Sequence, residues 1–132
     1  MRRARDTSVV NIHPAAAITK GLGGREMTEL GLLREAGAVA FTDGEHPVTS
    51  ASVMRRALTY ARDVGALLMP HLAEPSLVGG GVMNEGELAS RLGLAGAPKA
   101  AETIVFERDV RLTGITGGRY HAASLTCAES LA

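Results

Sequence analysis

The chain of 132 residues contains very little aromatic or sulfur chemistry. It has no tryptophan, two tyrosines, two phenylalanines and one cysteine, Cys127. A single cysteine cannot form an internal disulfide, which is typical of a reducing compartment, so we expect a cytoplasmic protein. Because aromatic side chains are scarce, the core must be built from Ala, Val, Leu, Ile and Met. Parallel sheets covered by helices have cores of this kind.

The sequence also lacks an excess of charge of either sign and any long apolar run. Fourteen basic and fourteen acidic residues balance, so no basic field is available for nucleic acid, and we expect no such partner. No stretch approaches the roughly 20 apolar residues of a membrane span. The basic residues at the N-terminus are not followed by the apolar segment of a secretory signal. With 45% hydrophobic residues, the chain is predicted to be a globular protein without membrane contact.

Short apolar runs alternate with amphipathic stretches along the chain. The clearest helix, 51–64, has a recurring apolar face and begins after a cap at Ser50 or Ser52. In a later helix, Glu107 and Arg111 have the i,i+4 spacing of an ion pair. We predict strands at 8–12, 38–41, 66–69 and 119–124, and helices at 26–36, 51–64, 85–92, 99–112 and from about 127. This alternation predicts one unit, residues 1–132, with a parallel α/β sheet.

Polar side chains follow the expected strands. His13, Asp43, His71 with Glu74, and His121 stand at or just beyond them, where parallel α/β folds place functional residues. Imidazole and carboxylate groups gathered there can bind Zn²⁺, which activates water. A lone histidine at a strand end is more often a structural hydrogen-bonding group than a metal ligand, and Asp43 can equally form a turn with the glycine that follows it. No His-x-His or His-Glu-x-x-His motif is present to decide between these interpretations.

Two glycine-rich segments, 21–24 and 79–81, lack the Gly-Lys-Ser/Thr ending of a phosphate-binding loop. We interpret both as turns. A small flavodoxin-like domain that binds a nucleotide or flavin remains an alternative, because four strands at helical intervals permit it. No phosphate-binding motif supports it.

Several segments together carry a more specific pattern: AITKG (17–21), EMTE (26–29), AGAVAFTDG (36–44), MNEG (83–86), RLGL (91–94) and GGRYH (117–121). In this order, with His71 and Glu74 between them, they resemble the middle of the dihydroorotases. These are zinc-dependent (β/α)₈ barrels of the cyclic amidohydrolase superfamily. The resemblance implies an α/β fold that is part of a TIM barrel, about half of it, so that the chain would be a central fragment.

The resemblance also implies where metal ligands would lie. His71 falls on a metal-binding histidine of the family. Asp43 falls on the first aspartate of an Asp-Asp pair whose second member is typically the ligand, and that second place holds Gly44 here. His121 falls on the first histidine of a His-x-x-His segment, and Ser124 replaces the second. His71, Asp43 and His121 are therefore the candidate ligands of a depleted site, with zinc expected to be weakly bound or absent in this chain.

Two functions follow from this resemblance. The first is a metal-dependent enzyme of pyrimidine biosynthesis that hydrolyses a cyclic amide C–N bond, interconverting dihydroorotate and N-carbamoyl-aspartate. His71 would be a ligand, with Asp43, Glu74 or His121 as substitutes for the missing ones. The second is a non-catalytic subunit that supports aspartate carbamoyltransferase. Half a barrel leaves two sheet edges unpaired, so we also expect the 132 residues alone to be insoluble, molten or self-associated.

Overall fold

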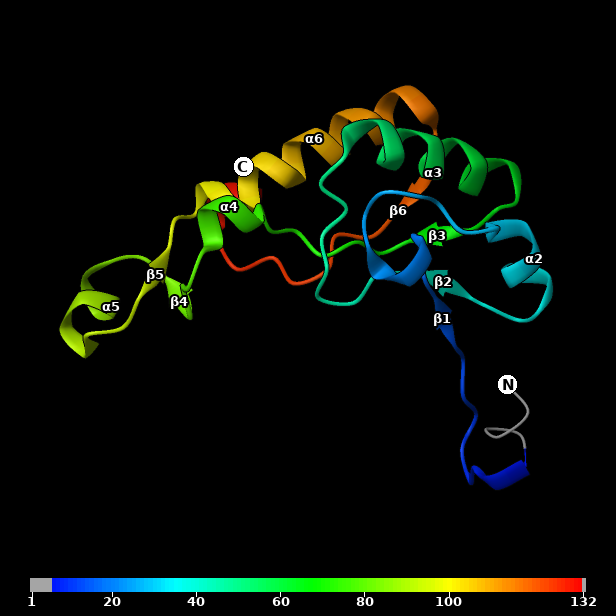
Figure 1. Ribbon diagram of the computed structural model, residues 1–132, viewed down its shortest axis with the longest axis horizontal. Coiled ribbons are helices and arrows are strands. Elements are labelled where there is room, and N and C mark those ends of the chain that lie inside the picture. The colour runs from blue at the N-terminus through cyan, green and yellow to red at the C-terminus, as the bar shows by residue number, and fades with distance from the viewer. Residues whose placement is uncertain (1–5, 132) are drawn as a thin grey trace.

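The main sheet consists of four short parallel strands whose order in space follows their order in the chain. The computed structural model describes residues 6–131 (Figure 1). The strands are β1 (Ala15–Ala16), β2 (Ala40–Phe41), β3 (Leu67–Leu68) and β6 (Arg119–Tyr120), and the sheet order is β1-β2-β3-β6. Parallel strands that follow one another in this way, joined through helices, are the arrangement found in (β/α)₈ barrels. The predicted parallel α/β fold is confirmed.

The two long helices lie side by side over this sheet (Figure 1). The cap of the first is Ser50, whose Oγ accepts a hydrogen bond from the backbone N–H of Val53 at 3.4 Å. The predicted pair between Glu107 and Arg111 is present at 3.5 Å. The helices are α2 (Leu30–Glu35), α3 (Ala51–Asp63), α4 (Pro75–Val78), α5 (Glu87–Leu92) and α6 (Ala100–Thr116), and 3₁₀ turns cover Lys20–Leu22 and Ala128–Leu131. Within residues 6–131, none of the helices is both long and apolar enough to cross a membrane.

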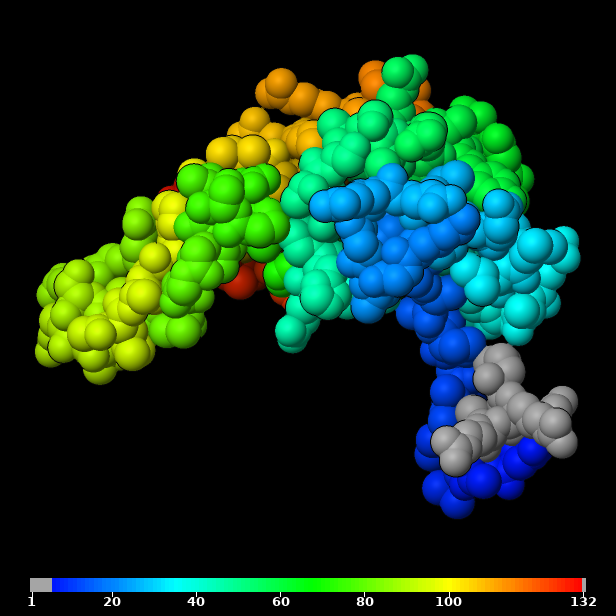
Figure 2. Space-filling view, viewed as in Figure 1, coloured from blue at the N-terminus to red at the C-terminus, as the bar shows by residue number. Residues whose placement is uncertain are grey.

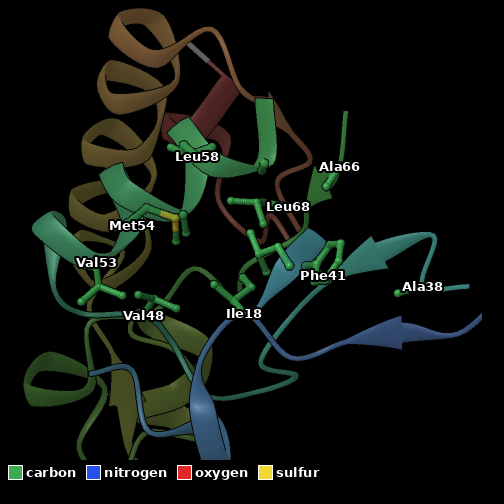
Figure 3. Close-up of a cluster of buried hydrophobic side chains, with 12 residues drawn as sticks. Ile18, Ala38, Phe41, Val48, Val53, Met54, Leu58, Ala66 and Leu68 are labelled. Atoms are coloured by element: carbon green, nitrogen blue, oxygen red, sulfur yellow. The ribbon is translucent and has the colours of Figure 1, made fainter. Parts of the chain in front are cut away.

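The core lies between the sheet and α3 and is aliphatic apart from one phenylalanine. Figure 3 shows Ile18, Phe41, Met54, Leu58 and Leu68 turned toward one another, and all five are fully buried. This is the core that the shortage of aromatic residues predicts. Strand β6 can approach α3 closely because Gly118 precedes it: a Cβ at this position would lie 2.8 Å from the backbone oxygen of Leu58.

A second, small parallel sheet lies apart from the first. Strands β4 (Met83–Asn84) and β5 (Gly96–Ala97) pair with each other and enclose α5. This arm projects from the body of the molecule (Figures 1 and 2). The sequence predicted the helix in the arm but neither strand, because two-residue strands are too short to show alternation of apolar and polar positions.

The prediction of a strand at 8–12 is wrong. That segment is irregular, and Val9 is 100% exposed. The first strand begins beyond Pro14, whose carbonyl accepts a hydrogen bond from Val39 N–H at 3.0 Å. An apolar run forms a strand only where a neighbouring strand can pair with it, and the partner, β2, lies beside Ala15–Ala16. His13 therefore precedes a strand and does not stand at the end of one.

Several of the predicted helices also differ in extent or type from those observed. The helix expected at 26–36 begins only at Leu30, because Met27 forms an antiparallel bridge with Thr19 and the N–H of Thr28 donates to Ile18 O at 2.9 Å. The helix expected at 99–112 continues to Thr116, where Gly117 (φ 69°) ends it. The helix expected from about 127 is a 3₁₀ turn.

Candidate functional site

The carboxyl ends of β3 and β6 meet at a pocket of about 160 Å³. His71 reaches it from beyond β3, and Ser124 reaches it from beyond β6. The two segments remain in register past the regular strands, because His71 forms an isolated parallel bridge with Ala123. Ser124, the next residue, has a φ of 62°. The structure therefore brings one predicted ligand, His71, to the same pocket as the serine that replaces another.

The remaining wall of the pocket comes from α6, the arm and the segment after β6. Asn84 of β4 donates from its side-chain amide to the backbone oxygen and to Oγ1 of Thr126, both at 3.3 Å. Glu102, near the start of α6, also lines the pocket. A complete small-molecule site usually encloses roughly 300–1,000 Å³. At about 160 Å³, this pocket is smaller than that range.

Glu102 is the most strongly engaged acidic group at the pocket. Its carboxylate accepts hydrogen bonds from Thr126 N–H at 2.7 Å, from Thr126 Oγ1 at 2.6 Å, from the Cys127 thiol at 3.1 Å and from the Ser130 hydroxyl. Burial raises the pKa of Glu102, but the hydrogen bonds from Ser130, Thr126 and Cys127 outweigh it and lower the pKa from 4.5 to about 2. Glu102 is therefore an anion that fixes the segment after β6.

Asp43 lies outside this pocket and is already committed to the backbone. It is 1% exposed, and its Oδ1 accepts hydrogen bonds from the N–H groups of Ile18 at 2.8 Å and Thr19 at 2.9 Å. The Thr19 hydroxyl donates to Oδ2 and in turn accepts from Gly24 N–H at 2.9 Å. Both carboxylate oxygens thus organise the turn that follows β1. Any metal bound by Asp43 would compete with these three donors.

The other candidates are also placed away from the pocket or used locally. The side chain of His121 is exposed, and its backbone N–H pairs with Leu68 O at 2.8 Å. Glu74 caps α4: its Oε1 accepts from the hydroxyl of Ser76 at 2.7 Å and from the backbone N–H of the same residue at 3.2 Å. These hydrogen bonds hold the pKa of Glu74 below its usual value. His13 is exposed in the segment that precedes β1.

The donor set within the described residues does not suffice for a zinc ion. Zinc sites commonly use three protein ligands and a water molecule. Within residues 6–131, no group of three or more His, Cys, Asp or Glu side chains is arranged so that it could hold a metal. His71 is the one predicted ligand at the pocket. Any zinc bound there would need ligands from outside this part of the chain.

Sequence reasoning missed Glu102 as a residue of the site. The signal was present, because Glu102 shares the buried stripe of α6 with Ala101 and Val105. An acidic side chain on the apolar face of a helix needs hydrogen-bond donors. The donors are three residues from beyond β6, which the sequence could not place beside α6.

A larger hollow, about 490 Å³, lies on the outer face of α3 among Arg55, Arg56 and Tyr60. All of its lining residues belong to this one helix. It lies away from the strand ends, and among residues 6–131 no carboxylate or imidazole from a second element lines it. The pocket at the ends of β3 and β6 is the better candidate site, although it is smaller.

Comparison with known proteins agrees with the fold. The chain superimposes on the L-hydantoinase (dihydropyrimidinase) from Arthrobacter aurescens with a TM-score of 0.68 and 16% identity, over 92% of this chain and 28% of that one. At this identity the match shows the fold: the four-stranded sheet corresponds to part of the barrel of a cyclic amidohydrolase. Open sheet edges are consistent with a partial barrel.

The family follows from closer relatives. The model of the dihydro-orotase-like family matches residues 1–130. The dihydroorotase of Desulfotalea psychrophila is 44% identical over 125 residues, which are 95% of this chain and 30% of that protein. The dihydroorotase of Anaeromyxobacter dehalogenans is 45% identical over 131 residues, 99% of this chain and 30% of that protein. The chain belongs to the dihydro-orotase-like family and spans about 30% of the length of these curated relatives. This assignment replaces the flavodoxin-like alternative.

Proposed function

We propose that the protein to which these residues belong is a dihydroorotase-type cyclic amidohydrolase. The observation that carries this proposal is the family match over nearly the whole chain, together with His71 at the carboxyl end of β3 in a pocket shared with β6. Ligands of parallel α/β barrels bind at this end of the strands. The substrate would be a cyclic amide such as dihydroorotate, and the product N-carbamoyl-aspartate.

The reaction is an addition of water to a ring amide. The oxygen of water bonds to the ring carbonyl carbon, the C–N bond breaks, and the ring nitrogen leaves with a proton. The pocket offers polar groups suited to an amide ring, namely the imidazole of His71, the hydroxyl of Ser124 and the amide of Asn84. Dihydroorotases and hydantoinases are in general metal-dependent. This segment supplies His71, and the other ligands would come from the rest of the barrel.

A second candidate function is that of a non-catalytic subunit that supports aspartate carbamoyltransferase. Two observations favour it. The position after Asp43 is Gly44, which has no side-chain ligand, and Ser124 offers a hydroxyl where an imidazole would bind zinc more tightly. Asp43 itself is occupied by the backbone at Ile18 and Thr19. In this role the pocket would be a remnant of an enzyme site.

One experiment separates the two functions. The whole protein is supplied with excess zinc, and the interconversion of dihydroorotate and N-carbamoyl-aspartate is measured before and after chelation. The enzyme predicts turnover that depends on zinc. No turnover with zinc supplied, combined with co-purification of aspartate carbamoyltransferase, would establish the second function. If neither turnover nor co-purification is observed, both proposals are wrong.

A further inference from the structure

The backbone beyond β6 is held mainly by side chains. After Tyr120, the N–H of His121 donates to Leu68 O of β3 at 2.8 Å, and Ala123 forms one bridge with His71 beyond the end of β3. The chain then continues without a strand until the 3₁₀ turn at Ala128–Leu131. This segment carries Ser124 into the pocket beside His71. Its position relative to β3 must therefore be determined by contacts from other elements.

Glu102 supplies most of these contacts. The side chain is 7% exposed. One of its oxygens accepts both the N–H and the hydroxyl of Thr126, and the other accepts from the thiol of Cys127 and the hydroxyl of Ser130. A single carboxylate on a rigid helix thus binds three residues of the segment that follows Ser124.

Two further contacts act at the margins of the same segment. Asn84 donates to Thr126 from the arm, at 3.3 Å. Lys99, at the start of α6, pairs with Glu129 at 2.7 Å, but both of these side chains are about half exposed. Exposed ion pairs contribute little to stability. Glu102 is the buried contact and is consequently the dominant one.

The backbone conformation of Ser124 shows why contacts that fix the chain on both sides of it are needed. Its φ of 62° lies in the left-handed region, which residues other than glycine rarely adopt. A residue persists there when the surrounding structure determines the path of the chain on both sides. The Ala123 bridge fixes the chain before Ser124, and Glu102 fixes it two residues later.

We infer that Glu102 is a positioning residue that holds position 124 in its left-handed conformation at the pocket that His71 also lines. Its importance for catalysis rests on the proposed function, but the geometric claim does not. The inference predicts that a ligand introduced at position 124 will act together with His71 only while Glu102 is present. Histidine is a suitable probe, because it tolerates the left-handed region better than most residues.

The test measures zinc binding to variants of the whole protein by calorimetry. Ser124→His should bind zinc about tenfold more tightly than the wild type, and adding His71→Ala should abolish the gain, as expected for two imidazoles on one ion. Adding Glu102→Gln should also remove most of the gain, because loss of a supporting contact typically costs about tenfold or more in metal affinity. The matched control is Glu107→Gln, an exposed residue of the same helix paired with Arg111, which should leave the gain unchanged.

Two results would overturn the inference: no gain with Ser124→His, or an unchanged gain when Glu102→Gln is added. If Glu102→Gln does not fold, the inference is tested instead by amide hydrogen exchange in the wild type. The Thr126 amide should exchange at least about a hundredfold more slowly than the same amide in an unfolded peptide, because its N–H is bound to Glu102. Exchange at the unfolded rate would contradict the inference. Neither readout uses turnover, so an inactive protein would refute the proposed function without affecting this result.

Discussion

The role of Asp43 yields the sharpest prediction about stability. Replacing Asp43 with alanine removes the acceptor of two backbone N–H groups, those of Ile18 and Thr19, and of the Thr19 hydroxyl. All three donors are in buried residues. A hydrogen bond to a charged group contributes about 1.5–3 kcal/mol, and an unsatisfied buried donor costs about 1–3 kcal/mol. We expect Asp43→Ala to lower the free energy of unfolding by about 4 kcal/mol.

The size of the effect should depend on how many acceptors remain. Asp43→Asn keeps one oxygen for the two N–H groups, and its amide can donate to the Thr19 hydroxyl, so the loss should be about 1–2 kcal/mol. The assay is urea unfolding of the whole protein with all metal removed by a chelator. Asp63→Ala serves as the control, because that aspartate is exposed and forms an exposed ion pair with its neighbour Arg62, and it should change the free energy by less than about 0.5 kcal/mol.

The chelator makes the experiment decisive between two roles. If Asp43 were chiefly a metal ligand, its removal would weaken zinc binding and have little effect on the metal-free protein. A loss below about 1 kcal/mol for Asp43→Ala in chelator would therefore refute the structural role.

Three further predictions concern packing, a buried charge and pH. Gly118→Ala should destabilise the protein by about 1–3 kcal/mol, because its Cβ would lie 2.8 Å from a backbone oxygen of α3. Gly114→Ala has open space around it and should stabilise the protein by about 0.5–1 kcal/mol, since alanine favours a helix over glycine. Thermal unfolding of both variants measures the difference. Arg108→Ala should cost about 3–5 kcal/mol in urea unfolding, because the fully buried Asp109 loses its cationic partner and the carbonyls of Val48 and Thr49 lose their donor. A loss as small as that of the exposed Arg111→Ala would contradict this. The pKa of Glu102 is lowered from 4.5 to about 2 in the folded protein, so the ionised carboxylate contributes about 3 kcal/mol to the free energy of unfolding. This contribution is complete above pH 4.5 and is lost as the pH falls toward 2. The stability of Glu102→Gln should lack this part of the acid dependence, and identical stability–pH profiles for the variant and the wild type would show the prediction to be wrong.

The elements that the sequence predicted well are those whose signals are local. Helix α3 has a capping serine, a continuous apolar face and a glycine just past its end, and the prediction was correct to within one residue. The strands at 38–41 and 66–69 are apolar runs between such helices, and both contain strands of the main sheet. Fold class followed because the alternation of strands and helices is a property of the whole chain.

The errors arose where the outcome depends on a distant partner. The run at 8–12 has the composition of a strand, but β2 pairs with Ala15–Ala16 instead. Residues 26–28 continue the helical pattern of α2, yet Met27 pairs with Thr19 in an antiparallel bridge and the helix begins only at Leu30. Neither outcome can be predicted from the local sequence, because each depends on pairing with a segment that the fold brings close.

In the candidate site, too, local features were predictable from the sequence and contacts between distant residues were not. The position of His71 at a strand end was predictable, since it follows an apolar run directly. That Asp43 binds the turn after β1, and that Glu102 binds the segment after β6, could not be predicted, because each contact joins residues 24 or more positions apart. The roles of His71, Asp43 and His121 in metal binding remain predictions.

The most direct test of the proposed function compares three forms of the whole protein in the zinc-supplied dihydroorotate assay: wild type, His71→Ala and His13→Ala. His13 is exposed and lies before the first strand, so its replacement should leave turnover unchanged. We predict that the wild type turns over dihydroorotate and that His71→Ala reduces turnover at least about a hundredfold while the protein remains folded. Turnover by His71→Ala equal to that of the wild type would contradict the assignment of the pocket between β3 and β6 as the active site.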